Sequence, residues 1–223
     1  LEIIKFYLIF LFLINLFFFI KENLIFDDGF LNLILIFTIT LAVSVWLANN
    51  FQLGWDPHHI WFPKALNFFY DQNISNLIDV NRPEYPYLGS LVWAIYYKFS
   101  LVQYEYFGRI FYIYFYILSI FSVSEILNQK NIFKVFAALL IISLSFKFKL
   151  FNGYQEILVF SVFTIISKYF YLMTQDDKKD FNFFIILILI FSLIWLKNEA
   201  IFFSFFFVQS KQPPGLPFSD LQL

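Results

Sequence analysis

The sequence predicts an all-α protein, a polytopic transmembrane helical bundle with an extracytoplasmic loop that carries short interfacial helices. Hydrophobic residues make up 61% of the 223 residues and charged residues only 14%, whereas a soluble domain is about half apolar and about a quarter charged. Apolar runs of near membrane-spanning length recur along the chain,. A polar stretch over 49–86 interrupts them. We therefore expect one transmembrane domain over 1–208 and an irregular tail over 209–223.

Composition excludes several other classes of protein. Aromatic residues make up 25% of the chain, which is far from the composition of a disordered protein. The 15 Lys and Arg residues against 16 Asp and Glu leave a net charge of -1, so no basic surface is expected to bind nucleic acid. The absence of Cys excludes disulfides, thiolate metal sites and cysteine nucleophiles. Because the chain starts at Leu1, has its one Met at Met173 and ends in a Pro-rich tail, we expect an amino-terminal fragment.

The apolar runs predict the helices in order. A crossing needs about 20 mostly apolar residues, with a range of roughly 17–25. The run 3–20 meets this with one interruption at Lys5, and the run 30–47 has no charge. The later runs are shorter or less clean, which a tilt or a re-entrant path can accommodate. They cover 87–99, 110–127, 133–146, 157–173, 181–196 and 200–208.

The polar stretch 49–86 predicts a functional loop, because loops carry function more often than the scaffold does. Asp56 and Pro57 form a helix-start signal, since Asp can cap a helix and Pro suits its first position. Pro63 is expected to divide this helix into two short pieces. The apolar residues fall on one side, which predicts an amphipathic helix in the interface plane that holds Asp56 just above the membrane. These apolar residues are Trp61, Ala65, Phe68 and Phe69.

Three features of this loop each admit a second interpretation. Asp56 is either a simple helix cap or a chemical group. Arg82 could hold a phosphate bidentately or be a solvated charge. The adjacent His58 and His59 suggest a metal site. On a helix, however, their side chains diverge by about 100° and cannot both coordinate one ion. We assign no metal site from the sequence.

Acidic residues also interrupt the later apolar runs. Glu156 lies in FNGYQEILVF at the start of the run 157–173, and Lys197 and Glu199 lie in IWLKNEAIFF between two runs. Ionisable groups at membrane depth are costly, so they indicate functional sites. The alternative for Lys197 is a polar turn with a snorkelling side chain, whereas Glu199 has a short side chain that cannot snorkel far.

The position of these acids constrains the topology. If all three apolar runs between the loop and Glu156 cross the membrane, Glu156 lies on the face opposite Asp56. We predict that 87–99, the shortest of the three and one that follows Pro86, is re-entrant or interfacial. Asp56 then shares the outward face with Glu156 and with the turn 197–199. Lys and Arg are spread over nearly every connection, so the usual charge bias does not set the orientation.

Four short strings resemble the GT-C superfamily of membrane glycosyltransferases. GWDPHHIWFPKA (54–65) resembles its first extracytoplasmic loop, and RPEYPYLGSLVWA (82–94) resembles its P-x-Y-P-L stretch. NGYQE (152–156) resembles its second acidic site, with Glu in place of the commoner Asp. WLKNEA (195–200) resembles its K-N-E-G element, with Ala in place of Gly. The resemblance extends over residues 30–208 and is to the protein mannosyltransferases, aminoarabinose transferases and undecaprenyl-linked sugar transferases.

The resemblance implies transfer of a sugar from a polyprenyl-phosphate donor to a glycan, lipid or protein acceptor on the outer face of the membrane. Asp56 matches the carboxylate that acts as general base on the acceptor hydroxyl, and Glu156 matches the second acidic site. Lone carboxylates fit both metal-dependent and metal-free chemistry, so no cofactor is assigned and a divalent metal stays open. Further residues are expected to bind the donor phosphate or the substrate: Lys64, Arg82, Tyr85, Lys197 and Glu199.

A polytopic transporter or a flippase-like component of envelope glycan assembly is the alternative function, and a non-catalytic scaffold is a third. Transporters usually carry broken helices at repeat-related positions, and the sequence shows no internal repeat. The heavy use of Phe, Ile, Asn and Lys is typical of an AT-rich genome, from which we expect a bacterial inner membrane with the active site facing outward. Membrane lipid is an expected partner, and nucleic acid is not.

Overall fold

The computed structural model describes residues 10, 13–14, 28–48, 52–100, 104–124, 126, 131–147, 150–175, 179–199 and 202. Every regular element in these ranges is a helix, which confirms the all-α class. The elements are α2 (Asp28–Ala48), η1 (Pro57–Trp61), α3 (Phe62–Phe69), η2 (Ile74–Asp79), α4 (Leu88–Phe99), α5 (Tyr106–Ser124), α6 (Asn131–Lys147), α7 (Glu156–Gln175) and α8 (Lys179–Leu196). Most of the runs 3–20 and 200–208, and the whole tail 209–223, lie outside the described residues.

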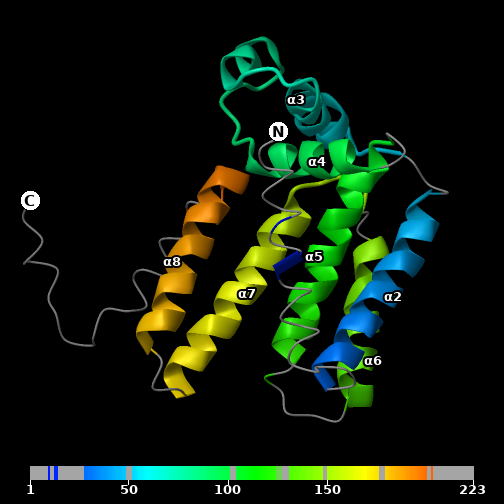
Figure 1. Cartoon of the computed structure of the whole chain (residues 1–223), viewed down its shortest axis with the longest axis vertical. Helices are drawn as coiled ribbons and strands as arrows, with labels where there is room; N and C mark the ends of the chain where they lie inside the picture. Colours follow the sequence, from blue (N-terminus) through cyan, green and yellow to red (C-terminus); the bar gives the residue numbers. More distant parts are fainter. Residues whose placement is uncertain are drawn as a thin grey trace, which may run out of the picture.

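The helices form a bundle with a cap on one end (Figure 1). α2, α5, α6, α7 and α8 run side by side, and α4 lies across the end of the bundle beneath α3. α7 packs against both α5 and α8, and α5 packs against α2 and α6. Ile113, Ile117 and Ile166 are fully buried in the core of this bundle. We call the segment 52–100, which includes α3 and α4, the cap.

α4 is short, and its side chains fix it across the end of the bundle, against the start of α5. Its 12 residues extend about 18 Å, short of the roughly 30 Å hydrocarbon core of a bilayer. The Trp93 indole N–H donates to the Glu105 carbonyl oxygen (2.9 Å), and the Tyr112 hydroxyl donates to the Gly89 carbonyl oxygen (2.8 Å). The run 87–99 therefore lies across the bundle instead of along it, and its re-entrant or interfacial place in a membrane stays a prediction.

The apolar face of α3 packs against α4. The Phe69 ring stacks on Tyr97 with a centroid distance of 4.2 Å, and Phe62 lies 5.6 Å from Trp93. The prediction placed this face on the membrane interface, but α4 covers it in the structure because its aromatic side chains supply the apolar partner. The residues predicted for the face are buried or half-buried: Trp61, Ala65, Phe68 and Phe69.

The helix that follows Asp56 changes its winding just before Pro63. The Phe62 N–H donates to the Pro57 carbonyl oxygen five residues earlier, so η1 is a wide π-helical turn,. α3 begins at Phe62 and holds Pro63 in its first turn, where the missing N–H costs nothing. The prediction that Pro63 divides the helix is therefore wrong, because the helical backbone continues through Pro63 and only its winding changes, between Trp61 and Phe62.

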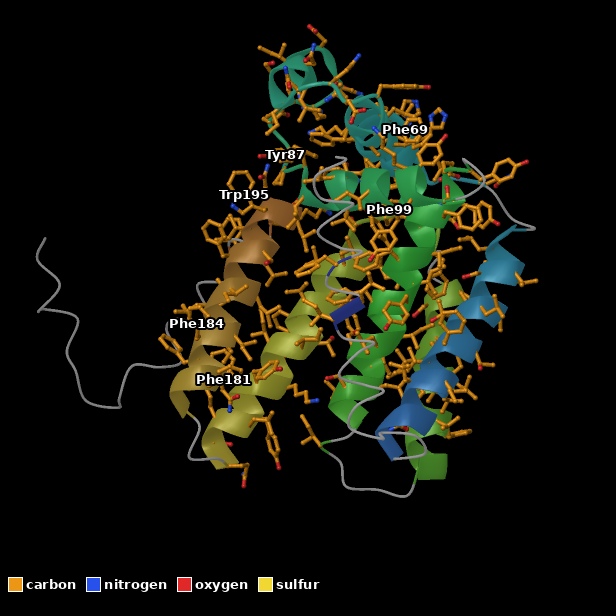
Figure 2. The ribbon with its side chains drawn as sticks, in the orientation of Figure 1. Phe69, Tyr87, Phe99, Phe181, Phe184 and Trp195 are labelled. Atoms are coloured by element: carbon orange, nitrogen blue, oxygen red, sulfur yellow. The ribbon has the colours of Figure 1, made fainter. Side chains whose placement is uncertain are left out.

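Apolar side chains lie on the outside of the bundle as well as in its core. Phe181 and Phe184 of α8 are both more than half exposed (Figure 2). A helix that is apolar all round is typical of a protein core or of a membrane span. Large exposed apolar side chains on α2, α6 and α8 include Leu33, Phe37, Leu41, Val45, Phe136, Leu140, Leu144, Leu187, Ile188 and Phe191.

Two of the described helices are long and apolar enough to cross a membrane. They cover Tyr106–Val123 in α5 and Glu156–Gln175 in α7. Three shorter apolar segments, Asn32–Leu47, Val135–Phe146 and Phe181–Leu196, belong to α2, α6 and α8. The all-helical architecture is therefore established for the described residues, and the polytopic membrane bundle is part of the proposal below.

Candidate functional site

Two loops far apart in the sequence meet where the cap joins the bundle. The Gly54 N–H donates to the Asn152 carbonyl oxygen (2.9 Å), which joins the segment before Asp56 to the loop before α7. A Cβ atom at Gly54 would lie 2.6 Å from the Tyr154 hydroxyl oxygen. The absence of a side chain at Gly54 thus leaves space for the Tyr154 ring. Asp56 and Glu156 consequently lie at the same end of the bundle, as the topological argument predicted.

Asp56 does not cap a helix. Its backbone is already helical (φ −60°, ψ −47°), and its side chain makes no capping hydrogen bond. A capping residue normally has an extended backbone, which turns its side chain back toward the first N–H groups of the helix. The carboxylate is half-buried. The interpretation of Asp56 as a simple cap is therefore wrong.

Glu156 and Lys197 form an ion pair between the start of α7 and the end of α8. Lys197 Nζ lies 2.5 Å from Glu156 Oε1, and the exposed fractions of the side chains are 19% for Lys197 and 42% for Glu156. The other carboxylate oxygen, Oε2, is buried and has no hydrogen-bond partner among the described residues. One oxygen of Glu156 thus fixes the ammonium, and the ion pair joins the start of α7 to the end of α8.

Asp56 and Glu199 act electrostatically on this ion pair. Burial lowers the pKa of Lys197, but the hydrogen bond to Glu156 and the charges of Glu156, Glu199 and Asp56 raise it more, so the pKa lies above its ordinary value. The ammonium therefore stays protonated at neutral pH. Three carboxylates and one ammonium form what we call the charged cluster. An anionic ligand that enters it must rely on Lys197 for its counter-charge.

An aromatic contact joins α4 to α8 near the end of α8. Tyr87, just before α4, meets Trp195 edge to face with a centroid distance of 5.6 Å (Figure 2). Trp195 lies in the last turn of α8, two residues before Lys197. The contact therefore joins the start of α4 to the end of α8 beside the ion pair.

No family model, no curated protein and no solved structure matches the chain. The likeness to the GT-C superfamily therefore rests on the four short strings. The chemistry of the site is inferred from its geometry. Three of the four strings supply cluster residues: 54–65 supplies Asp56, 152–156 supplies Glu156, and 195–200 supplies Lys197 and Glu199.

Lys64 lies outside the charged cluster and serves the scaffold of the cap. Its side chain is fully buried, and Nζ donates to the carbonyl oxygens of Arg82 and Tyr85, each at 2.7 Å. The ammonium also lies 5.8 Å from the Trp61 ring, within the range of a cation–π interaction. This burial leaves Lys64 no surface for a donor phosphate, although the sequence predicted that role.

The pH dependence of stability tests the assignment of Lys64. Burial lowers its pKa to about 8, and the charge of Glu84 opposes that effect. Above about pH 8 the folded protein binds fewer protons here than the unfolded chain, whose Lys titrates near 10.5. Stability relative to Lys64→Met should therefore rise with pH from about 8 upward, by at most about 1.4 kcal/mol per pH unit. Denaturant titrations of both proteins would measure it, and a pH-independent difference would contradict burial of the charge.

Arg82 and Tyr85 lie in the turn that Lys64 holds. Arg82 has a positive φ of 57°, and its guanidinium Nη1 lies 3.6 Å from Glu84 Oε1 with 60% of the side chain exposed. The Tyr85 ring packs 5.7 Å from Trp61. Arg82 is therefore accessible to a phosphate, whereas Tyr85 makes the contacts of a scaffold residue.

The two histidines after Asp56 are exposed on the cap. His59 Nδ1 lies 2.9 Å from the Trp55 carbonyl oxygen, and its ring stacks on Trp55 with a centroid distance of 4.7 Å. The His58 and His59 rings are tilted by 64° to each other. In the part of the chain that the structure describes, no three His, Cys, Asp or Glu side chains group as metal ligands.

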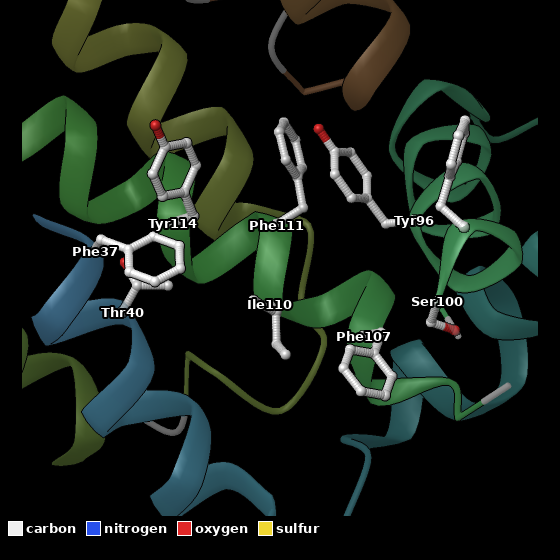
Figure 3. Close-up of a pocket in the computed structure, with 9 residues that line it drawn as sticks. Phe37, Thr40, Tyr96, Ser100, Phe107, Ile110, Phe111 and Tyr114 are labelled. Atoms are coloured by element: carbon white, nitrogen blue, oxygen red, sulfur yellow. The ribbon is translucent and has the colours of Figure 1, made fainter. Parts of the chain in front are cut away.

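A separate aromatic pocket of about 430 Å³ lies between α2, α4 and α5 (Figure 3). It is located at the Tyr96–Ser100 end of α4, whereas the charged cluster lies near the other end of that helix. The pocket has no charged lining residue, so it suits apolar groups and not the phosphate of a substrate. Its lining residues are Phe37, Thr40, Tyr96, Phe99, Ser100, Phe107, Ile110, Phe111 and Tyr114.

Sequence reasoning missed two buried polar residues next to the cluster, Gln155 and Ser90, which are both 0% exposed. Gln155 precedes Glu156 directly, within the NGYQE string. Its position directly before Glu156, at the start of the apolar run 157–173, is the signal that could have identified Gln155. Ser90 carries no signal in the sequence, because its partner is 29 residues away.

Proposed function

We propose that the chain is an integral membrane glycosyltransferase. It moves a sugar from a polyprenyl-phosphate donor to an acceptor hydroxyl at the capped end of the bundle. The observation that carries this proposal is the charged cluster, in which Asp56, Glu156, Lys197 and Glu199 come together from three distant parts of the sequence.

The exposed apolar side chains of the bundle support a membrane location. α2, α6 and α8 carry large apolar residues on surfaces that no other described element covers. Soluble proteins rarely leave extended apolar surfaces in water. In a bilayer these side chains meet lipid, and the charged cluster lies where the bundle meets the cap. A lipid-linked donor then reaches the cluster with its phosphosugar while its hydrocarbon chain stays in the membrane.

The residues of the cluster suit glycosyl transfer by direct displacement. Asp56 accepts the proton of the acceptor hydroxyl as its oxygen attacks the anomeric carbon of the donor sugar. The bond between the anomeric carbon and the phosphate oxygen breaks, and the polyprenyl phosphate leaves with the bonding electron pair. Lys197 stabilises the negative charge on the leaving phosphate. Glu156 fixes Lys197 through Oε1.

Asp56→Asn tests the proposal, because the amide keeps the shape of the side chain and removes the base. Transfer from radiolabelled polyprenyl-phosphate hexoses and pentoses should fall about 10²–10⁴-fold in kcat/KM, with normal insertion into membranes. The matched control is Asp79→Asn, the same change at an exposed residue of η2, which should stay within about twofold. Undiminished transfer by Asp56→Asn would refute the assignment of the base, and no transfer by the wild type would refute the function.

A further inference from the structure

Gln155 lies where the ends of three helices meet. Its side chain is 0% exposed, and its carboxamide lies between the first turn of α4 and the last turn of α8. It also precedes the first residue of α7. A buried carboxamide with unmatched donors or acceptors is destabilising. Its hydrogen-bond partners therefore reveal which elements Gln155 joins.

The carboxamide bonds to the backbones of α8 and α4. In the amide orientation that gives each atom a partner, the nitrogen donates to the Leu196 carbonyl oxygen (2.8 Å) and the oxygen accepts from the Ser90 N–H (3.2 Å). Leu196 directly precedes Lys197, so the first bond fixes the backbone from which the ammonium extends. Both partners are main-chain groups, which cannot swing away as side chains can.

The backbone of Gln155 fixes the other half of the ion pair. Its carbonyl oxygen accepts from the N–H groups of Leu158 (2.9 Å) and Val159 (3.1 Å), and these bonds close the first turn of α7 around Glu156. The Ser90 hydroxyl in turn donates to the Trp61 carbonyl oxygen (2.9 Å) in the last residue of η1. Two hydrogen-bonding residues thus connect the helix that follows Asp56 with both members of the ion pair.

The backbone of α4 approaches the carboxamide closely at Gly89. A Cβ atom at Gly89 would lie 2.6 Å from Gln155 Cδ, closer than any real Cβ contact. The backbone of α4 therefore rests directly on the carboxamide. A change at Gln155 is transmitted to α4 and, through Ser90, to η1.

We propose that Gln155 is a positioning residue that sets the separation between the Asp56 carboxylate and the Glu156–Lys197 pair. It touches neither the donor nor the acceptor in this proposal, and it acts by holding η1, α4, α7 and α8 in one arrangement. The role in turnover rests on the proposed function, whereas the role in geometry does not. A misplacement of about 1 Å in a catalytic site can cost about 10²-fold in rate.

Spin labels can measure the separation directly, because the chain contains no Cys. Cysteines at the exposed positions His58 in η1 and Asn198 after α8 provide the label sites in detergent or nanodiscs. Gln155→Met keeps the side-chain length and removes both hydrogen bonds. We expect it to broaden or shift the distance distribution between the labels. The matched control, Gln72→Met at an exposed position of the cap, should leave the distribution unchanged.

Gln155→Glu makes the experiment independent of whether the Met variant folds. A protonated carboxyl group has the shape of a carboxamide, and its O–H can donate to the Leu196 carbonyl oxygen. Ionisation removes that donor and adds a charge beside Glu156, and burial with this neighbour raises the pKa of the new carboxyl group. We therefore expect a distance distribution like that of the wild type at low pH and a broadened one at high pH, while Gln155 itself shows no such change.

Kinetics separate positioning from a general loss of structure. Gln155→Met should lower kcat about 10²-fold with KM for the acceptor within about twofold, and unchanged label distances together with unchanged kcat would overturn the proposal. A lost kcat with unchanged distances would overturn it as well, since the residue would then act in some other way. If the wild type transfers no sugar, the proposed function fails, and the distance measurements still decide the geometric role of Gln155.

Discussion

Replacing Lys197 by glutamate is expected to abolish sugar transfer, with a loss of about 10³-fold or more. The change removes the ammonium that balances the donor phosphate in the proposed function, and it adds a fourth carboxylate to the group of Asp56, Glu156 and Glu199. The added carboxylate repels the other three carboxylates and the phosphate of the donor. Because both partners of the ion pair are partly exposed, the loss of stability should be smaller, about 1–3 kcal/mol. Initial rates in membranes and melting temperatures in detergent measure the two effects.

The exchanged double variant Glu156→Lys with Lys197→Glu separates stability from catalysis. It restores an ion pair between α7 and α8, so we expect most of the melting temperature to return. Transfer should stay low, because the cation then extends from α7 instead of α8. Recovery of both would show that Lys197 serves only to hold the two helices together. The conservative change Lys197→Arg keeps the charge at its position and should retain more transfer than Lys197→Glu.

Gly108→Ala is expected to have a large structural effect for a single added methyl group. A Cβ atom at Gly108 would lie 2.6 Å from the Trp93 carbonyl oxygen, and a backbone atom cannot rotate away. α4 must therefore move off α5, although Trp93 is fully buried and bonded to Glu105. Overpacking of this kind costs about 1–3 kcal/mol and occasionally more. Thermal unfolding followed by circular dichroism would show the loss.

A substitution nearby provides the control for Gly108→Ala. Ile110→Ala lies two residues along α5 and removes atoms at the open aromatic pocket, so nothing is forced into a neighbour. It should lower the melting temperature less, and it should leave sugar transfer close to that of the wild type. If Gly108→Ala melted like the wild type, the tight crossing of α4 and α5 would be wrong, and the flat position of α4 would lose its support.

Local composition predicts the bundle helices well. The uncharged run 30–47 corresponds to α2 (Asp28–Ala48), and 181–196 corresponds to α8 (Lys179–Leu196), because apolar length alone determines both. α5 begins four residues earlier than the run 110–127 suggested. The reason is that Arg109 forms an ion pair with Glu105 one turn away (2.5 Å). Paired charges can thus be accommodated at a helix start that hydropathy assigns to a loop.

Long-range contacts set the features that the sequence did not predict. Lys64 finds its two carbonyl partners 18 and 21 residues away, and Gln155 lies 65 residues from Ser90. Neither the sequence spacing of these residues nor their types predict such partners. The resemblance to the GT-C superfamily suggested Asp56, Glu156, Lys197 and Glu199 as site residues, and the short run 87–99 implied a helix that does not cross and so allowed them to share one face. Counting the membrane crossings predicted that these residues lie at one end of the bundle. It did not predict the ion pair between Glu156 and Lys197.

The flat position of α4 also limits how such a fold can grow or shrink. From the cap the chain runs down α5 and back along α6, then down α7 and back along α8 (Figure 1), so Lys197 returns to Asp56 after two complete hairpins. One helix gained or lost between them would leave Lys197 at the far end of the bundle. Insertions and deletions that preserve the site must therefore come as pairs of helices.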